Sequence, residues 1–250
     1  MKLSLKIAKL EEQIVTKYLE GLSASQISKD FKIDNKTTLK VLKNRGIVKP
    51  VGKHKLYTLN DDYFENIDSE EKAYWLGFII ADGCIMNNML AVSLAIIDKE
   101  HLIKLNNELN STYKVKEYKN CCRLDITSDK LVTDLRKYGL IERKSLNATL
   151  PILSNYLVPH LWRGIIDGDG CITKRKSGRQ KGQVRLNLVG SKEIIEKFTI
   201  FCESIINKRL KIACLGNFYR AEVAGLFASK IIDYIKPNSI MYLKRKWNDN

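Results

Sequence analysis

The sequence predicts an α+β protein, with a small all-helical domain followed by a larger domain built from two copies of one unit. Apolar residues recur at helical spacing over residues 1–48, and one eleven-residue motif occurs twice, 87 residues apart. Each copy is followed by short runs of alternating apolar and polar residues, which are typical of β-strands. The 250 residues, 44% of them hydrophobic and 28% charged, are enough for two folded domains and exclude a low-complexity chain.

Membrane, secreted and zinc-binding classes are excluded first. The longest apolar run is far shorter than the ~20 residues that span a bilayer. The N-terminal segment MKLSLKIAKL is interrupted by lysines and lacks the apolar stretch of a secretory signal. The six cysteines form no C-x-x-C pair, so they are interpreted as small hydrophobic residues in a reducing compartment. We expect a cytoplasmic protein, or one of an organellar matrix if an organelle encodes it.

The charge distribution indicates a polyanionic partner. The formal net charge is +15, and it divides into +8 for residues 1–59, −3 for residues 60–160 and +10 for residues 161–250. Two basic regions therefore flank a slightly acidic one. Because no basic amphipathic helix with an aromatic or leucine face occurs, nucleic acid is favoured over a membrane surface.

Residues 1–48 predict three short helices. The first carries Leu10, Ile14 and Tyr18 on one face and ends at Gly21. Ser23 is the expected N-cap of a second helix over residues 24–31. The third helix is expected to start at Asp34 or Asn35, either of which can act as the N-cap, and to end before Gly46. Leu39 and Leu42 are expected to face inward.

This helical domain resembles the helix-turn-helix of recombinases and transposon resolvases over about 40 residues. The resemblance implies DNA binding by the third helix, where side chains that can reach bases or phosphates are expected at Asn35, Lys36, Thr37, Thr38 and Lys40. The alternative is a three-helix packing module whose lysines only confer solubility. The following residues, 49–59, read as a basic linker that could lie along a phosphate backbone through Lys53 and Lys55, and the second domain then spans residues 60–250.

The repeat in the second domain is the most specific feature of the sequence. Residues 75–85 read WLGFIIADGCI and residues 162–172 read WRGIIDGDGCI, with seven of eleven positions identical. An Arg-Lys pair closes each copy, in LIERKS (residues 140–145) and YLKRKW (residues 242–247). We therefore expect two repeat halves, about residues 72–150 and 159–250. The expected strands are residues 89–96, 113–118, 121–127, 183–189, 209–215 and 218–224, with hairpin turns at Lys119-Asn120 and Gly216-Asn217.

Small residues four apart suggest that the two motif helices pack closely. Gly77 with Ala81, and Gly164 with Gly168, lie on one face of their helices. If the helices pack side by side, Asp82 and Asp169 emerge together at the C-terminal ends, where both the other carboxylate and the helix dipoles disfavour their charge. A cation resolves this conflict, and carboxylates with the backbone carbonyls of Ala81 and Gly168 are ligands that suit Mg²⁺.

The motif has two other possible interpretations. A single Asp-Gly after a helix is most often an ordinary turn, but here it occurs twice. A calcium-binding loop starting at Asp167 is excluded because no Glu stands at loop position 12.

Both motifs resemble the signature of the LAGLIDADG homing endonucleases, in the form with two motifs on one chain, and the resemblance covers about 180 residues. It implies two αββαββα halves, saddle-shaped antiparallel sheets that grip the DNA major groove, and Mg²⁺-dependent cleavage of both strands. The metal-binding acids of the family fall on Asp82 and Asp169. Its central basic residue, which stabilises the charged phosphate, falls on Lys144 and Lys246, for which an ordinary surface lysine is the alternative. Mn²⁺ is expected to substitute, and Ca²⁺ to support binding without cleavage.

The sequence departs from the signature at the earlier Asp of the motif, which is Ile80 in the first copy and Asp167 in the second. We expect activity to survive and Asp167 to form local hydrogen bonds. DNA contacts are expected from the basic segment after the second motif and from sheet residues, namely Lys174, Arg175, Lys176, Arg179, Lys181, Arg185 and Asn187, with Arg123 and Arg220 as weaker candidates. A merely solvated loop is the alternative for the basic segment. The acidic run at residues 61–71 is expected to lie away from DNA.

The expected function is a site-specific double-strand DNA endonuclease that acts as a monomer, since one chain carries both motifs. The alternative is a non-cleaving relative, such as a transcription regulator or an intron maturase. Retention of both motif aspartates argues for cleavage. An intein is not expected, because the sequence starts with Met and has no His before its final Asn.

Overall fold

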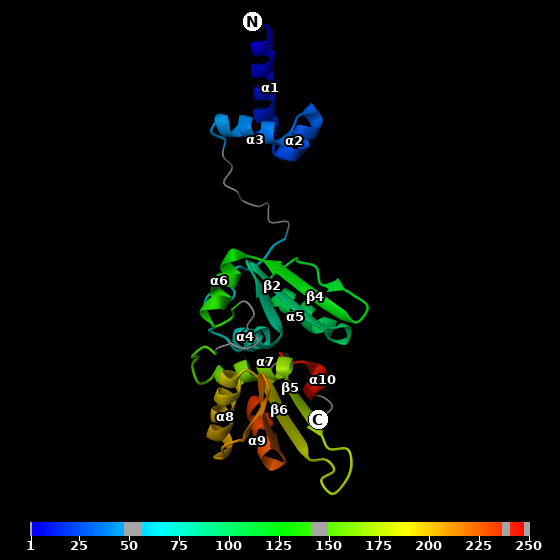
Figure 1. The fold of residues 1–250 in the computed structure, drawn as a ribbon, viewed down its shortest axis with the longest axis vertical. Coiled ribbons are helices and arrows are strands. Elements are labelled where there is room, and N and C mark those ends of the chain that lie inside the picture. Colours follow the sequence, from blue (N-terminus) through cyan, green and yellow to red (C-terminus); the bar gives the residue numbers. More distant parts are fainter. Residues whose placement is uncertain (1, 48–56, 142–149, 237–240, 248–250) are drawn as a thin grey trace. The chain divides into compact units, whose positions relative to one another are not determined.

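The computed structural model describes residues 2–47, 57–141, 150–236 and 241–247, with side chains from Lys9 onward. The chain divides into two compact units, Met1–Leu56 and Tyr57–Asn250 (Figure 1). In the described part, no helix is both long and apolar enough to cross a membrane.

The N-terminal unit contains three helices, α1 (Lys2–Leu19), α2 (Ala24–Phe31) and α3 (Asn35–Asn44). Ile14, Ile27 and Leu42, one from each helix, form its buried core. Ser23 caps α2 with a capping box shared with Gln26, and the carboxylate of Asp34 caps α3 by accepting from the backbone N–H of Lys36 at 3.2 Å. Both helix starts follow from the residues at these positions.

Two expectations for α3 are wrong. Leu39 is 50% exposed, whereas Thr38 is fully buried and its hydroxyl lies 2.8 Å from that of Ser28. Thr38 and Leu39 lie four and three residues before Leu42, so the helical period allows either on the inner face, and the packing of α3 against α1 and α2 places Thr38 there. Thr38 therefore cannot contact DNA from this position.

The second unit contains two halves of the same element order, as expected for an αββαββα repeat. The first half comprises α4 (Glu70–Asp82), β1 (Gly83–Met86), β2 (Met89–Ala95), the 3-10 turn η1 (Ile96–Asp98), α5 (Lys99–Glu108), β3 (Lys116–Glu117), β4 (Cys121–Thr127) and α6 (Asp129–Lys137). The second half comprises α7 (Val158–Asp169), β5 (Gly170–Lys174), β6 (Val184–Gly190), α8 (Lys192–Ile206), β7 (Ile212–Leu215), β8 (Phe218–Ala224), α9 (Leu226–Ile235) and α10 (Lys244–Trp247).

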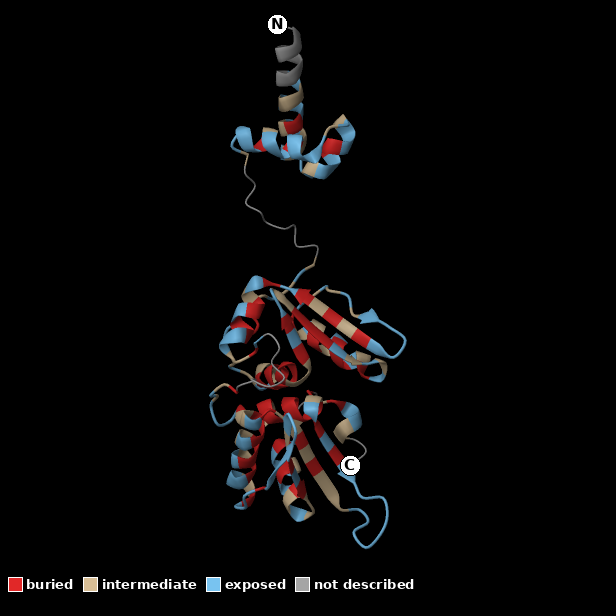
Figure 2. Ribbon diagram, in the orientation of Figure 1, coloured by how far each residue is buried: buried red, intermediate tan, exposed pale blue. Residues whose placement is uncertain are grey.

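Each half forms a four-stranded antiparallel sheet, in the orders β1-β2-β4-β3 and β5-β6-β8-β7. The register is also repeated, because Gly83 pairs with Val92 in the first sheet and Gly170 with Leu188 in the second. Alternating residues are buried under the helices, as the banded strands in Figure 2 show. The predicted strands are confirmed, although those at residues 113–118 and 209–215 are shorter, at Lys116–Glu117 and Ile212–Leu215.

The end of the expected linker belongs to the second unit. The ring of Tyr57 stacks on that of Tyr113 with centroids 4.5 Å apart, and the backbone N–H of Thr58 donates to the hydroxyl of Thr112 at 2.8 Å. Residues 57–59 are thus packed chain rather than linker. Lys53 and Lys55 lie outside the described residues.

Candidate functional site

Helices α4 and α7 pack directly on each other through glycines. A Cβ added at Gly77 would overlap the carbonyl oxygen of Leu161, and one added at Gly164 would overlap that of Tyr74 and lie 2.7 Å from the backbone nitrogen of Phe78. Any side chain at either glycine would therefore push the two backbones apart. The spacing of small residues in the sequence predicts this packing.

The contacts also set the direction of the helices. Gly164 lies against Tyr74 and Phe78, and Gly168 lies one turn further along against Ala81 and Asp82. The two helices therefore run in the same direction, and their C-terminal ends lie together.

Asp82 and Asp169 are the last residues of these two helices, and each is followed by a glycine that begins a strand. The Oδ2 atom of Asp82 lies only 3.2 Å from the place where a Cβ on Gly168 would stand. Asp82 is half-buried and Asp169 is exposed. The fold thus brings both carboxylates, and the carbonyls of Ala81 and Gly168, to one end of the helix pair.

Lys246 occupies the same end from the C-terminal segment. Its Nζ donates to the carbonyl oxygens of four α7 and β5 residues: Ile166 at 3.0 Å, Asp167 at 2.5 Å, Gly168 at 3.0 Å and Gly170 at 2.7 Å. An ammonium has three hydrogens, so at least one is shared between acceptors. The positive charge therefore lies on the negative end of the α7 dipole, next to Asp169.

The negative charges that act on Lys246 come from both motifs. Burial lowers the pKa of Lys246, whereas the negative charges of Asp167 and Asp82 oppose that shift. Asp82 belongs to the first half and Lys246 to the second, so the helix ends form one electrostatic site. Lys144, the equivalent in the first half, lies outside the described residues.

The donor set suits a hard divalent cation. In the part of the chain that the structure describes, no three His, Cys, Asp or Glu side chains lie close enough to hold a metal together. Two carboxylates supplemented by backbone carbonyls match the preference of Mg²⁺ for oxygen ligands, since Mg²⁺ retains water and shares phosphate oxygens of its substrate. The carbonyl of Gly168 would be shared with Lys246.

The second sheet presents polar side chains on one face. Arg185 and Asn187 alternate with the buried Leu186 and Leu188, as the sequence predicts. Arg185 lies 3.5 Å from Glu222 on the neighbouring β8, and the buried Nε of Arg185 has no hydrogen-bond partner among the described atoms. Arg220 is exposed on the same strand as Glu222.

The segment between β5 and β6 is a basic hairpin loop. Its basic side chains Arg175, Lys176, Arg179 and Lys181 are all exposed, as is Lys174 at the end of β5. The backbone of Arg175 bonds to those of Gly182 and Gln183, and its guanidinium donates to Gln180 at 2.6 Å. Of these residues, Arg175 is therefore the one whose side chain is already engaged within the loop.

In the first sheet, two basic side chains are paired with an acidic one. Arg123 donates to the carboxylate of Asp125 at 2.6 Å, and Lys116 approaches the same carboxylate at 3.0 Å. Burial of Asp125 acts against its ionisation, but these two partners lower its pKa below the usual range. A DNA contact by Arg123 would have to replace an existing ion pair.

The N-terminal unit offers the exposed face of α3. Asn35, Lys36, Thr37 and Lys40 are exposed on it, whereas Thr38 is buried, as described above. The amide oxygen of Asn35 also accepts from Ser28 at 3.2 Å.

Sequence reasoning missed the role of Asp167. Asp167 was expected to bond locally, but it is buried and its partners are Tyr74, Leu243 and Trp247, which are 76 to 93 residues away. No local sequence pattern identifies partners this far along the chain. The strongest signal in the sequence is that the position of Asp167 is occupied by Ile80 in the first motif.

A search of solved structures found meganucleases. I-SmaMI bound to uncleavable DNA with a TTGT central four matches with a TM-score of 0.51 and 16% identity, over 72% of this chain and 86% of that chain. I-CpaMI and I-AabMI, each bound to uncleaved DNA, match with TM-scores of 0.48 and 0.46 and identities of 17% and 14%, over 69% of this chain and 86% and 85% of theirs. No protein-family model and no curated protein matched the sequence.

I-SmaMI is a LAGLIDADG homing endonuclease. At 16% identity the match shows the fold alone. The topology agrees with it, because two motif helices pack on each other and each leads into a four-stranded antiparallel sheet. The second unit of this chain therefore has the fold of the LAGLIDADG homing endonucleases, in the form that carries both motifs on one chain.

Proposed function

We propose that this chain is a site-specific endonuclease that hydrolyses both strands of double-stranded DNA, with divalent metal held at Asp82 and Asp169. The observation that carries the proposal is the parallel packing of α4 and α7 at Gly77 and Gly164, which brings two carboxylates to one helix end. Charge at that position is disfavoured because two carboxylates and two helix C-termini repel each other, and Lys246 supplies a single positive charge against them.

Asp82, Asp169 and the carbonyls of Ala81 and Gly168 are the groups that would hold Mg²⁺. When bound, the metal supplies activation of water and stabilisation of the leaving oxygen during phosphodiester hydrolysis. The chain itself contributes position and charge, since Lys246 neutralises the end of α7 beside Asp169. Mn²⁺ should replace Mg²⁺, and Ca²⁺ should support binding without cleavage. I-SmaMI, too, has been crystallised with its uncleaved target in the presence of calcium ions, a structure that matches this one with a TM-score of 0.49.

The DNA-binding surface in this proposal is the open face of the second sheet and its basic loop. Arg185 and Asn187 are suited to guanine and adenine edges in the major groove, and Arg220 lies on the same sheet. The loop lysines and arginines would contact phosphates, which sets position rather than sequence. In the N-terminal unit, the exposed face of α3 would add contacts and lengthen the site through Asn35, Lys36, Thr37 and Lys40.

The test is selection from a library of randomised duplex DNA. The protein is incubated with the library in Mg²⁺ and, in parallel, in Ca²⁺, and the bound and the cleaved fractions are sequenced. The expected result is one long shared sequence, bound in both metals and cut only in Mg²⁺. A single chain per DNA, measured by light scattering of the complex, is expected because both motifs lie in one polypeptide.

Three variants make the test specific. Asp82→Asn and Asp169→Asn should each abolish cleavage while binding in Ca²⁺ or without metal persists, because the amide keeps the shape but loses the charge. Asp233→Asn, an exposed acid on α9, is the matched control and should cut like the unmodified chain. Sequence-specific binding without cleavage in Mg²⁺ or Mn²⁺ would overturn the endonuclease and favour a regulator or a maturase.

A further inference from the structure

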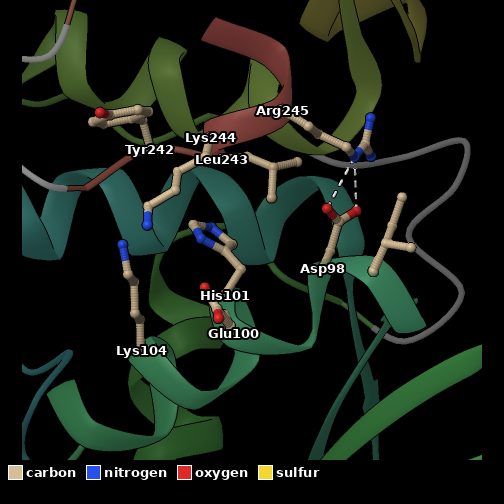
Figure 3. A pocket seen from close by; sticks show the side chains of 9 residues that line it. Asp98, Glu100, His101, Lys104, Tyr242, Leu243, Lys244 and Arg245 are labelled. Atoms are coloured by element: carbon tan, nitrogen blue, oxygen red, sulfur yellow. Dashed lines mark hydrogen bonds and ion pairs between the residues drawn. The ribbon is translucent and has the colours of Figure 1, made fainter. Parts of the chain in front are cut away.

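The C-terminal strap, residues 241–247, belongs to the second half but is anchored to the first. Arg245 Nε lies 2.9 Å from each carboxylate oxygen of Asp98, which is buried where η1 meets α5. Figure 3 shows this pair at one side of a cavity of about 220 Å³ that the strap and the start of α5 line together. The strap therefore contacts the first half as well as its own half.

Asp167 of α7 accepts hydrogen bonds from two residues of the strap. Its side chain is 1% exposed and accepts from the backbone N–H of Leu243 at 2.7 Å and from the indole Nε1 of Trp247 at 2.6 Å. These two residues bracket Lys246. Burial raises the pKa of Asp167, but the donors around it favour the ionised form.

A third donor to Asp167 comes from the first half. The hydroxyl of Tyr74 donates to Asp167 Oδ2 at 2.8 Å, and His101 Nε2 lies 2.8 Å from the same hydroxyl. Burial lowers the pKa of His101 to about 3, so the ring is neutral at pH 7, and it donates to Tyr74 when its proton is on Nε2. The hydrogen bonds thus run from α5 through α4 to α7 and the strap.

These contacts lie on both sides of Lys246 in the strap. Its Nζ reaches four carbonyls at the end of α7 and the start of β5, and the strap contacts α7 at Leu243 and again at Trp247. Asp167 lies one helical turn before Gly170, so the same helix that ends in Asp169 also carries the anchor of the strap. A shift of the strap would withdraw the ammonium from the helix end.

We propose that Asp167 is a positioning residue, which, together with Tyr74 and the Asp98–Arg245 pair of the first half, fixes Lys246 at the end of α7 beside the proposed metal site. This inference rests on the proposed function. In this arrangement the charge on the second motif depends on side chains of the first half, so the two halves are not independent catalytic units. Asp167 acts through Lys246, since its own carboxylate is buried and bonded to Tyr74, Leu243 and Trp247.

The test uses conservative variants of the full chain and two readouts. Asp167→Asn, Tyr74→Phe and Trp247→Phe each remove part of the hydrogen-bond set, and Tyr138→Phe, whose hydroxyl donates to Glu65 in the first half, is the matched control. Hydrogen exchange at the amide of Leu243 reports the strap directly, and single-turnover cleavage in saturating Mg²⁺ reports the chemistry. We expect about tenfold faster exchange and about tenfold slower cleavage for the first three variants, with DNA affinity in Ca²⁺ changed less than about twofold.

Coupling between residues gives a further criterion. Asp167→Asn combined with Trp247→Phe should slow cleavage no more than the worse of the single variants, because both remove one interaction. Lys246→Met should show the cleavage defect with the Leu243 amide still protected, since it removes the charge without loosening the strap.

The outcomes distinguish failure of the positioning role from failure of the proposed endonuclease function. For Asp167→Asn, Tyr74→Phe and Trp247→Phe, faster exchange at Leu243 with unchanged cleavage would overturn positioning, and so would slower cleavage with unchanged exchange. Failure of the unmodified chain to cut any DNA would instead contradict the proposed function, and that result is obtained before any variant is made.

Discussion

Gly77 of the first motif helix lies so close to Leu161 of the second that no side chain fits between them. The matching contact of Gly164 with Tyr74 makes glycine necessary on both helices. The order of the contacts along the two helices gives them the same direction, which brings Asp82 and Asp169 to the same end. The proposed chemistry therefore depends first on a packing detail and only then on the acidic residues.

Adding one methyl group at this contact should destabilise the second unit. Gly77→Ala or Gly164→Ala should lower the free energy of unfolding by about 3 kcal/mol, because the new Cβ meets backbone atoms that cannot move aside. Gly190→Ala is the matched control: its Cβ would lie 3.4 Å from Ile194, an ordinary contact, and the change should stay within about 1 kcal/mol. Urea unfolding of the three variants measures this, and equal losses at all three positions would contradict it.

Stability should fall on acidification because of His101. Its pKa is about 3 in the folded chain, whereas an unfolded histidine titrates near 6.5, so between these values the unfolded state binds the additional proton. The contribution of His101 is therefore complete above pH 6.5 and decreases by up to about 1.4 kcal/mol per pH unit below it. The raised pKa of Asp167 acts in the opposite direction at low pH.

The comparison with His101→Gln isolates this effect. Glutamine can still donate to Tyr74 but does not titrate. Unfolding free energies measured from pH 7 to pH 4 should fall less steeply for His101→Gln than for the unmodified chain. Parallel slopes would show that the acid sensitivity has another source.

The buried threonine and the exposed lysine of α3 should behave differently. Thr38→Val removes the hydroxyl that lies 2.8 Å from Ser28 and should cost about 1 kcal/mol of stability without changing DNA affinity. Lys40→Gln changes an exposed side chain and should weaken DNA binding without changing stability. Unfolding curves and fluorescence anisotropy on the selected target measure both; weaker binding by a stable Thr38→Val variant would contradict the burial argument.

The basic loop between β5 and β6 should contribute salt-dependent affinity. Replacing Lys176 and Arg179 together by Gln should reduce the slope of log affinity against log salt by about 2, because two phosphate contacts are lost. The loss should be nearly the same on specific and unrelated DNA. A control with the exposed Lys230→Gln on α9 should leave the slope unchanged, and an unchanged slope in the double variant would show that the loop is merely solvated.

Much of the fold could be predicted from local patterns. The repeated motif, the alternation along Cys121–Thr127 and Phe218–Ala224, and the capping residues Ser23 and Asp34 all act within a few residues, and the structure contains the elements they predict. The small residues four apart on each motif helix were sufficient to predict a close helix pair. Fold class and the candidate pair of acids were thus determined by the sequence itself, because they depend on periodicity and on spacing along one element.

Other features depended on tertiary contacts. The inward turn of Thr38 in place of Leu39 follows from how α3 meets Ile14 and Ile27, which the helical period alone does not specify. The pairing of Lys116 with Asp125 required the register of β3 on β4. The largest difference is at Asp167 and Lys246, whose partners lie 76 to 93 residues away, because burial of a charge is stabilised by whichever donors the folded chain brings to it and the sequence carries no local record of them.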